Sequence, residues 1–353
     1  MTSTSAYKTM LIQIVIWLIL SSLLVSEVHG AKAIYAFGDS YIDAGNANVS
    51  NDHLSWTKPY GMTWPGYPSG RASNGRTQLD YIAEKFNLPS PIAFQQLINT
   101  TDLTQGVNFA VSGTGVTYCW GHPTLHTQVD QFEALIKSAN ISKSHLNESV
   151  AFINIGLNDH TTYHGELQGI PAWIDIIVDG ITYNIWRIND LGIKNIMVTN
   201  VPPLDCGPWA TYINNFTSCT KNETLIMENI QHNAKLAKAI QTLQHNTANM
   251  HVILLNQTRA MNYLLSSKSS GFVNTTVPCC HGWGELGYWQ CGLNNKNGDP
   301  IYTLCSNPSE TFWWDHGHPS DAGAKALIEL YWSMIGFTRF GRNIESWVRR
   351  YNI

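Results

Sequence analysis

The chain has 353 residues, a formal net charge of −4 and only 13% charged residues. A slightly acidic chain without a basic stripe is unsuited to nucleic acid, so we expect no nucleic-acid partner. Soluble domains typically carry about one quarter charged residues, so other polar groups must help to keep this chain soluble.

Residues 1–30 have the pattern of a secretory signal peptide. Lys8 precedes an apolar stretch from Met10 to Val25, and the segment 28–30 then offers a site suited to signal-peptidase cleavage. The apolar run is shorter than the roughly 20 residues that span a bilayer, so we predict cleavage and no stable membrane anchor. Residues 31–353 contain no linker, charge block or internal repeat, which favours a single domain.

The first predicted element after the signal is a short buried strand over residues 33–37. Gly38 and Asp39 break this apolar run and place Ser40 directly after it. Open α/β sheets carry their chemistry at the carboxyl edge of the strands, so Ser40 is the first candidate functional residue. Residues 50–76 are rich in Gly, Pro, Ser and Trp and predict a long loop over the same edge.

The rest of the chain alternates between strand and helix patterns. The predicted strands are 105–110, 150–155, 195–201 and 252–255, and the predicted helices are 77–86, 129–136, 174–191, 223–244 and 320–335. Gly192 is expected to end one helix and Ser320 to cap another. This alternation predicts an α/β fold in which helices cover both faces of a mostly parallel sheet, a three-layer α/β/α sandwich.

Seven cysteines in a secreted chain indicate disulfides. The short segment between Cys206 and Cys219 makes this pair the first expected bridge, and Cys119 is the expected unpaired cysteine. The pairing of the remaining cysteines stays open; they are Cys279, Cys280, Cys291 and Cys305. The paired spacing of a zinc site is missing, so we expect no metal.

Asparagine sequons give a second indication of secretion. Their hydrophilic glycans would offset the low content of charged residues, and we expect several of the sites to be used. The candidate positions are Asn48, Asn99, Asn140, Asn147, Asn215, Asn222, Asn256 and Asn274.

Four short motifs follow one another along the chain, and each ends or follows a predicted strand or turn. They are Gly38-Asp39-Ser40, Asn108 to Thr114, Gly156-Leu157-Asn158-Asp159, and Trp314 to Pro319, in which Asp315 precedes His318 by three residues. In this order they resemble the GDSL esterase/lipase family of SGNH hydrolases, and its plant members above all. The segments 64–76 and 278–280 are also similar to that branch.

The resemblance implies a flavodoxin-like SGNH fold and a serine hydrolase without metal or cofactor. By the family pattern, Ser40 is the nucleophile, His318 the general base and Asp315 the residue that orients it. The backbone N–H groups of Ser40 and Gly113 and the side-chain amide of Asn158 would form the oxyanion hole. These residue types suit ester cleavage, which needs a nucleophile, a base, an orienting acid and oxyanion donors.

The sequence departs from the family pattern at Tyr41, His160 and Ser320. None of these changes removes a reactive group, so they concern the fit of the substrate. The loops 50–76 and 271–312 are expected to choose among lipid, polysaccharide and specialised-metabolite esters. Aromatic residues of the loops are candidates for lining the pocket; they are Trp56, Trp64 and Trp120.

Several other motifs match the pattern of a functional site but lack the sequence context that such a site needs. Gly282 to Gly287 matches Gly-x-Gly-x-x-Gly, but 278–280 precedes it instead of a strand, which disfavours a dinucleotide site. His122 and His126 have metal-ligand spacing on a helix, but Pro123 lies between them, and we expect exposed histidines. His316 and His318 could bind a metal on a strand, but Asp315 and Ser40 favour a base. The Gly-x-Ser-x-Gly motif of α/β-hydrolases is missing.

We therefore predict a secreted, glycosylated serine hydrolase acting on carboxylic esters, located in the apoplast, the cell wall or the vacuole. Its substrate would be a small-molecule, lipid or polysaccharide ester. One alternative is an acyltransferase, in which an alcohol resolves the same acyl-enzyme. A further alternative is an inactive secreted binding glycoprotein, which would predict damage to the catalytic motifs.

Overall fold

The computed structural model describes residues 30–47, 54–99, 101–117, 119–163, 165–266, 270–282 and 290–353. The predicted signal peptide, the sequon at Asn48 and most of the Gly282–Gly287 motif lie outside these ranges. Within them, no helix combines the length and the apolar character needed to cross a membrane.

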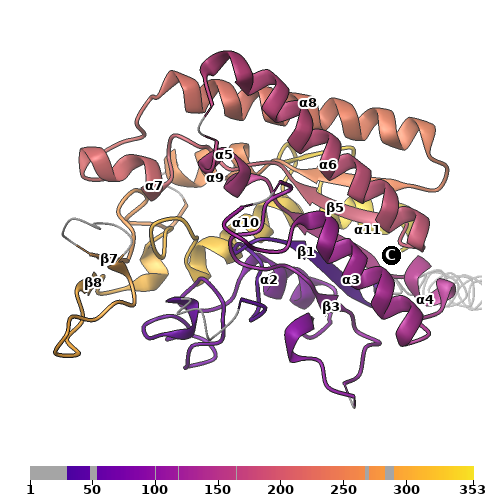
Figure 1. Cartoon of the computed structure of the whole chain (residues 1–353), viewed down its shortest axis with the longest axis horizontal. Coiled ribbons are helices and arrows are strands. Elements are labelled where there is room, and N and C mark those ends of the chain that lie inside the picture. The colour runs from indigo at the N-terminus through magenta and orange to yellow at the C-terminus, as the bar shows by residue number, and fades with distance from the viewer. Residues whose placement is uncertain are drawn as a thin grey trace, which may run out of the picture.

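A seven-stranded sheet runs through the described chain in the order β2-β3-β1-β4-β5-β6-β9 (Figure 1). Its strands are β1 Ile34–Gly38, β2 Ile92–Ala93, β3 Val107–Asn108, β4 Val150–Asn154, β5 Asn195–Thr199, β6 His251–Leu255 and β9 Thr338–Arg339. All pairings are parallel except that between β6 and β9. A separate antiparallel pair joins β7 Cys280–Gly282 and β8 Tyr302–Leu304.

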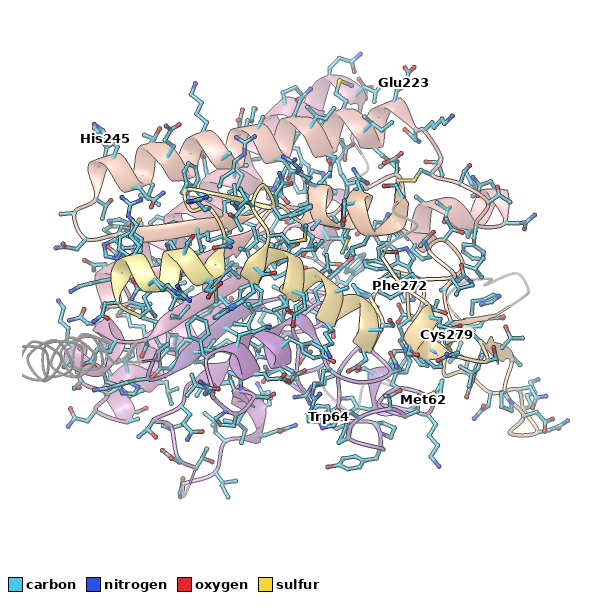
Figure 2. All side chains as sticks on the ribbon, turned by 180° about the vertical axis from the view of Figure 1, so that it is seen from behind. Met62, Trp64, Glu223, His245, Phe272 and Cys279 are labelled. Atoms are coloured by element: carbon cyan, nitrogen blue, oxygen red, sulfur yellow. A yellow bond between two sulfur atoms is a disulfide. The ribbon has the colours of Figure 1, made fainter. Side chains whose placement is uncertain are left out.

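Helices cover both faces of the sheet, so the predicted three-layer fold is confirmed (Figure 1). One face carries α2 Gln78–Lys85, α9 Gln257–Ser266, α10 Asp321–Ser333 and α11 Ile344–Tyr351. The other face carries α3 Leu125–Ser138, α6 Ile170–Leu191 and α8 Glu223–Asn246, and Figure 2 labels the first residue of α8 and His245 near its end. The shorter helices are α4 Lys143–Asn147, α5 Leu157–Thr161 and α7 Pro208–Thr211.

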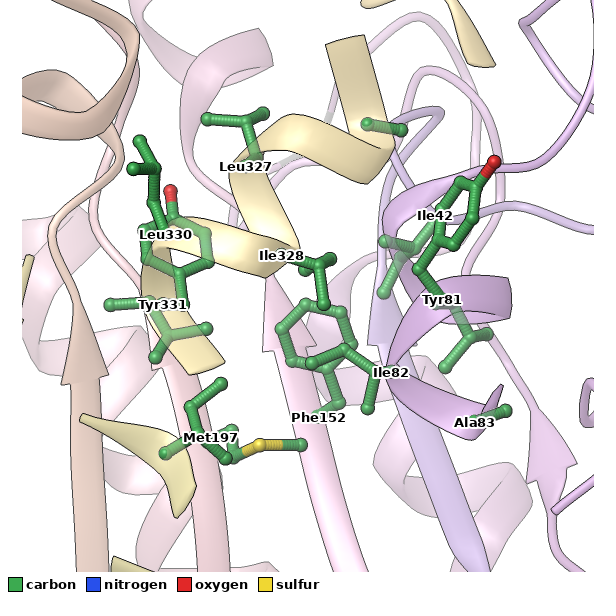
Figure 3. Packing of buried hydrophobic residues seen from close by; sticks show 14 of the residues in the cluster. Ile42, Tyr81, Ile82, Ala83, Phe152, Met197, Leu327, Ile328, Leu330 and Tyr331 are labelled. Carbon is green, nitrogen blue, oxygen red and sulfur yellow. The ribbon is translucent and has the colours of Figure 1, made fainter. Parts of the chain in front are cut away.

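The alternation of side chains along the strands builds one core on each face. Phe152 and Met197 point toward α2 and α10, where Ile82 and Ile328 pack over them (Figure 3). In β1, the side chain of Tyr35 lies on the opposite face of the sheet and belongs to the core there. The central strands are therefore apolar throughout, as a sheet covered on both faces requires.

Most predicted elements exist, but several of their bounds differ. Helix α3 begins four residues before the predicted 129–136 helix, because the Thr124 side chain caps it by accepting from Thr127 N–H. The 105–110 strand shrinks to the two residues of β3. Gly192 ends α6 with a positive φ of 126°, and the Ser320 side chain caps α10, as predicted.

The disulfides confirm one predicted pair and resolve the open ones. Cys206 bonds to Cys219, and Cys119 is free and buried. The pairing that the sequence left open is Cys279 with Cys305 and Cys280 with Cys291.

Candidate active site

The end of β1 is shaped so that Ser40 leaves the sheet at its carboxyl edge. A Cβ on Gly38 would lie 2.0 Å from the Asn154 carbonyl oxygen of the neighbouring strand, so this position requires glycine. The Gln128 side chain bonds both the N–H and the carbonyl of Gly38, each at 2.8 Å. The Asp39 carboxylate then accepts the Tyr41 N–H at 3.0 Å and closes the turn around Ser40.

The structure brings Ser40, His318 and Asp315 together from opposite ends of the chain. The Ser40 Oγ lies 2.7 Å from His318 Nε2. The His318 Nδ1 lies 2.7 Å from Asp315 Oδ1 and 3.0 Å from its Oδ2. If Nδ1 carries the proton, it donates to the carboxylate, and Nε2 is left to accept the serine hydroxyl.

A tight turn presents the acid and the histidine to the same side. The Trp314 N–H donates to the His318 carbonyl at 2.7 Å, and Trp313 forms an isolated bridge with Pro319. Asp315 Oδ1 also accepts the backbone N–H groups of Gly317 and His318, each at 2.9 Å. Asp315 and His318, three residues apart, are therefore brought together by a turn that the Asp315 carboxylate itself stabilises.

The electrostatics of this cluster couple the Asp315 carboxylate to the His318 imidazole. Burial alone would raise the pKa of Asp315, but the positive charges of His318 and His316 and hydrogen bonds outweigh it and hold this pKa well below its usual range. Burial lowers the pKa of His318, but the Asp315 carboxylate more than offsets this and raises it above the ordinary value. Burial also raises the pKa of Asp39 to about 7, partly opposed by the Tyr41 N–H.

Gly113 and Asn158 lie on two neighbouring segments beside Ser40. Gly113 has a φ of 82°, and a Cβ there would lie 2.5 Å from the His122 ring, so only glycine fits. Asn158 stands in the first turn of α5 and donates its side-chain Nδ2 to the Thr114 carbonyl at 2.7 Å. A primary amide has two N–H groups, so this bond leaves a second donor for the adjoining cavity.

Asp159 joins the same two segments through its buried carboxylate. It accepts the N–H groups of Val116 and Thr117 at 2.9 and 2.8 Å and the Thr117 hydroxyl at 2.6 Å. In the sequence, this residue stood out only as the last member of the Gly156-Leu157-Asn158-Asp159 motif. Its contacts instead lock α5 to the loop that follows Gly113.

A cavity of about 780 Å³ opens over these groups. Its wall combines polar residues of the site with apolar side chains, and it includes Ser40, Gly113, Asn158, His318, Leu54, Tyr60, Trp120, His122, Leu157, His160, Leu204, Trp209 and Leu225. The predicted loop 50–76 therefore contributes Leu54 and Tyr60 to the cavity wall. A cavity of this size and mixed character is typical of a small-molecule site.

The three tryptophans proposed for the pocket lie in different places. Trp120 is 57% exposed and forms part of the cavity wall. Trp56 donates its indole N–H to the Ala47 carbonyl at 2.8 Å. Trp64 stacks beneath the guanidinium groups of Arg71 and Arg76.

The candidate metal-ligand histidines are likewise separated by the structure. His126 is exposed on α3, but His122 is half-buried in the cavity wall, so the expectation of two exposed histidines is wrong for His122. Asp315, His316 and His318 place ligand atoms within 4.8 Å of one another, which would allow a cation. Both ring nitrogens of His318 are, however, within hydrogen-bond distance of Ser40 or Asp315, as a proton-transferring base requires.

Of two further groups beside the site, Tyr60 was not predicted from the sequence, and His160 was expected only to affect the fit of the substrate. Tyr60 donates its hydroxyl to Asp315 Oδ2 at 2.7 Å. His160 lies 3.0 Å from Glu228 Oε2 and 3.1 Å from His232 Nδ1. All three interactions join residues more than 60 positions apart, and no local pattern marks such pairs.

The chain is similar to known proteins over most of its length, including the residues of the candidate site. The model of the GDSL-like lipase/acylhydrolase family matches residues 34–331. The GDSL esterase/lipase At3g09930 of Arabidopsis thaliana is 34% identical over 310 residues, which cover 84% of this chain and 86% of that protein. A GDSL lipase of Tanacetum cinerariifolium is 28% identical over 316 residues, which cover 86% and 84% of the two chains.

Solved structures give more distant matches. An extracellular lipase from Streptomyces rimosus is 13% identical with a TM-score of 0.36, and the match covers 85% of this chain and 99% of that one. A phospholipase A1 from Streptomyces albidoflavus is 12% identical with a TM-score of 0.37, covering 84% and 95%.

Proposed function

Because the chain belongs to the GDSL-like lipase/acylhydrolase family and is a carboxylic ester hydrolase, we propose that it cleaves its ester through an acyl-enzyme on Ser40. The observation that carries this proposal is the continuous relay from Ser40 Oγ to His318 Nε2 and from His318 Nδ1 to Asp315, with 2.7 Å at each step. This relay lies in the wall of the cavity.

In the first half-reaction, Ser40 Oγ attacks the acyl carbonyl carbon while His318 Nε2 takes the hydroxyl proton. The carbonyl π-bond becomes an oxyanion, which the N–H groups of Ser40 and Gly113 and the free N–H of Asn158 would stabilise. The C–O bond to the alcohol then breaks, and the imidazolium returns its proton to the leaving oxygen. Asp315 keeps the imidazole in the correct tautomer and stabilises its positive charge.

In the second half-reaction, water enters the cavity and His318 accepts one of its protons as the oxygen attacks the acyl carbon. Collapse of the second tetrahedral intermediate breaks the bond to Ser40, which recovers its proton from His318. The carboxylic acid then leaves. An alcohol in place of water would give a transferred ester by the same steps.

The substrate is an ester with an apolar acyl or alcohol part, which can contact the apolar side chains of the cavity wall. Trp120, Trp209, Leu204 and Leu225 supply apolar surface, while the polar groups gather around Ser40. Burying apolar surface of the ester against these side chains favours binding, so each contact influences the choice of ester. Lipid and specialised-metabolite esters fit this surface better than a bare acetyl group on a polysaccharide.

We further propose that the protein is secreted and glycosylated. Disulfides persist in oxidising compartments, and the described chain contains three. The exposed sequons Asn99, Asn140, Asn215 and Asn222 are the favoured glycan sites, because Asn147, Asn256 and Asn274 are half-buried. Mass spectrometry of the secreted protein, with and without glycosidase treatment, tests both the sites and cleavage near Gly30.

The test of the reaction uses the full-length chain expressed through a secretory host. Parent and Ser40→Ala proteins are compared on short-chain and long-chain p-nitrophenyl esters, with an alcohol acceptor added in parallel. We expect turnover and fluorophosphonate labelling of Ser40 only in the parent, and unchanged turnover in a Ser138→Ala control on the surface of α3. Turnover by a folded Ser40→Ala protein would refute the acyl-enzyme proposal.

A further inference from the structure

The carboxylate of Asp315 has two oxygens with different surroundings. Oδ1 accepts hydrogen bonds from its own turn, namely from the N–H groups of Gly317 and His318 and from the imidazole. Oδ2 faces the imidazole at 3.0 Å and accepts the Tyr60 hydroxyl at 2.7 Å. Tyr60 is thus the donor that a distant segment, 255 positions away in the chain, brings to this oxygen.

Tyr60 is held in place by the protein that surrounds it. Tyr60 is 2% exposed, and its ring packs edge to face against the Trp314 ring, with 6.0 Å between the two ring centroids. A Cβ on Gly292 would lie 3.3 Å from Tyr60 Cε2, so the tyrosine ring also packs closely against that backbone. A side chain enclosed in this way loses little further freedom when its hydroxyl donates to the carboxylate.

The disulfide-bonded segment supports Tyr60 from behind. Tyr60 and Trp314 form one buried cluster with Cys279, Cys280 and Cys291. The Thr57 hydroxyl donates to the Leu54 carbonyl at 2.8 Å and also lies 3.3 Å from the Gly292 carbonyl, so the two loops are in contact there. Figure 2 shows Met62 and Cys279, which belong to these loops, at the same end of the molecule.

From these contacts we propose that Tyr60 is a positioning residue of the active site, which fixes the Asp315 carboxylate so that the carboxylate in turn orients His318. This inference rests on the proposed function, because it assigns to Tyr60 an effect on the residue that orients the base. Tyr60 touches Asp315 and does not act on the ester itself.

The chemistry of the hydrogen bond gives the role a direction. Burial and the neighbouring carboxylate raise the pKa of Tyr60 well above its ordinary value, so its hydroxyl keeps its proton. The positive end of the O–H dipole points at Asp315 and offsets part of the negative field that the carboxylate exerts at the imidazole. Without this hydroxyl, the pKa of His318 should rise, because the less compensated carboxylate favours the imidazolium more strongly.

The experiment uses Tyr60→Phe in the full-length secreted protein, because phenylalanine keeps the ring and removes only the hydroxyl. Charge-assisted hydrogen bonds are among the stronger ones, so we expect kcat to fall roughly tenfold with little change in KM. The acid limb of the kcat/KM profile should move to higher pH. Tyr35→Phe is the matched control, because the Tyr35 hydroxyl is buried without a hydrogen-bond partner among the described residues.

A double-mutant comparison separates positioning from a merely structural role. If Tyr60 acts through Asp315, the loss caused by Tyr60→Phe should largely disappear in an Asp315→Asn background. The second-order rate of fluorophosphonate labelling at Ser40 measures this even where turnover is slow. An equal loss in both backgrounds, or an unshifted pH profile in Tyr60→Phe, would overturn the inference.

The same set of variants distinguishes this inference from the proposed function. Full activity in Asp315→Asn alone would refute the proposed relay. A severe loss in Asp315→Asn together with a Tyr60→Phe protein identical to the parent would refute only the role of Tyr60.

Discussion

The Asn158 side-chain amide donates to the Thr114 carbonyl at 2.7 Å, so the two segments that carry the candidate oxyanion donors are bonded to each other. One segment follows β3 and contains Gly113, and the other follows β4 and begins α5. Asp159 adds a second connection through Val116 and Thr117. The spacing between the donors is therefore fixed by the protein before an oxyanion forms, which is the condition for effective electrostatic catalysis.

Replacing Asn158 by alanine should remove both the oxyanion donor and the bond to Thr114. We expect kcat to fall about 10²–10³-fold while KM changes little, because the donor acts mainly on the developing charge. Steady-state kinetics on p-nitrophenyl esters measures this. Asn158→Asp should be at least as impaired, since an ionised carboxylate cannot donate and would repel the oxyanion. A higher KM with an unchanged kcat would instead assign Asn158 to substrate binding.

Asp159→Asn should weaken the connection between the two segments. An amide offers one acceptor oxygen where the carboxylate has two, so at least one half-buried N–H of Val116 or Thr117 would lose its partner. We expect the free energy of unfolding to drop by roughly 1–3 kcal/mol, measured by urea denaturation. A lower kcat should accompany the loss. Asp175→Asn, which alters an exposed carboxylate on α6, is the control and should change neither quantity.

The sequence predicts the central strands because burial on both faces makes them continuous apolar runs, as in Val150–Asn154. It misses β9, because this edge strand has only two residues, too few for an alternation of apolar and polar side chains to be recognised. It also misses α9 and α11, although Ala260, Met261 and Leu264 have helical spacing that could have revealed the first of these.

The candidate site likewise contains residues that could be predicted from the sequence and one that could not. Ser40, Asp315 and His318 stand in short motifs with a fixed order, so the sequence could indicate them without any knowledge of their distances. Tyr60 belongs to a loop without periodicity, and its contact with Asp315 depends on how two loops pack. Tertiary contacts of this kind leave no mark on the local sequence.

The pKa of His318 predicts the acid limb of the pH profile. The base must be neutral to accept the serine proton, and the Asp315 carboxylate raises its pKa above the ordinary value of about 6.5. We therefore expect kcat/KM to rise with pH and to reach half its maximum above about pH 6.5. In Asp315→Asn, this midpoint should move to lower pH, and the proposed relay predicts a fall in kcat of about 10⁴-fold, as in the Ser-His-Asp triad. Stopped assays over pH 4–9 would show an unmoved midpoint if another acid orients His318.

Asp39 gives the last prediction, because its carboxyl group is 1% exposed and its Oδ2 has no hydrogen-bond partner among the described residues. Burial raises its pKa to about 7 in the folded protein, against about 3.9 in the unfolded chain. The folded state therefore binds a proton that the unfolded state lacks between these values. The resulting stabilisation is complete below about pH 4, shrinks as pH rises from 4 to 7, and is lost above pH 7.

Asp39→Asn keeps an oxygen for the Tyr41 N–H without a charge. Its free energy of unfolding should therefore exceed that of the parent by a margin that grows from about pH 4 and reaches up to about 4 kcal/mol above pH 7. Because the Asp39 charge also raises the pKa of His318, the acid limb of kcat/KM should move to lower pH in this variant. Urea denaturation of both proteins at pH 5 and pH 9 tests the first effect, and a constant difference between them at the two pH values would contradict a raised pKa for Asp39.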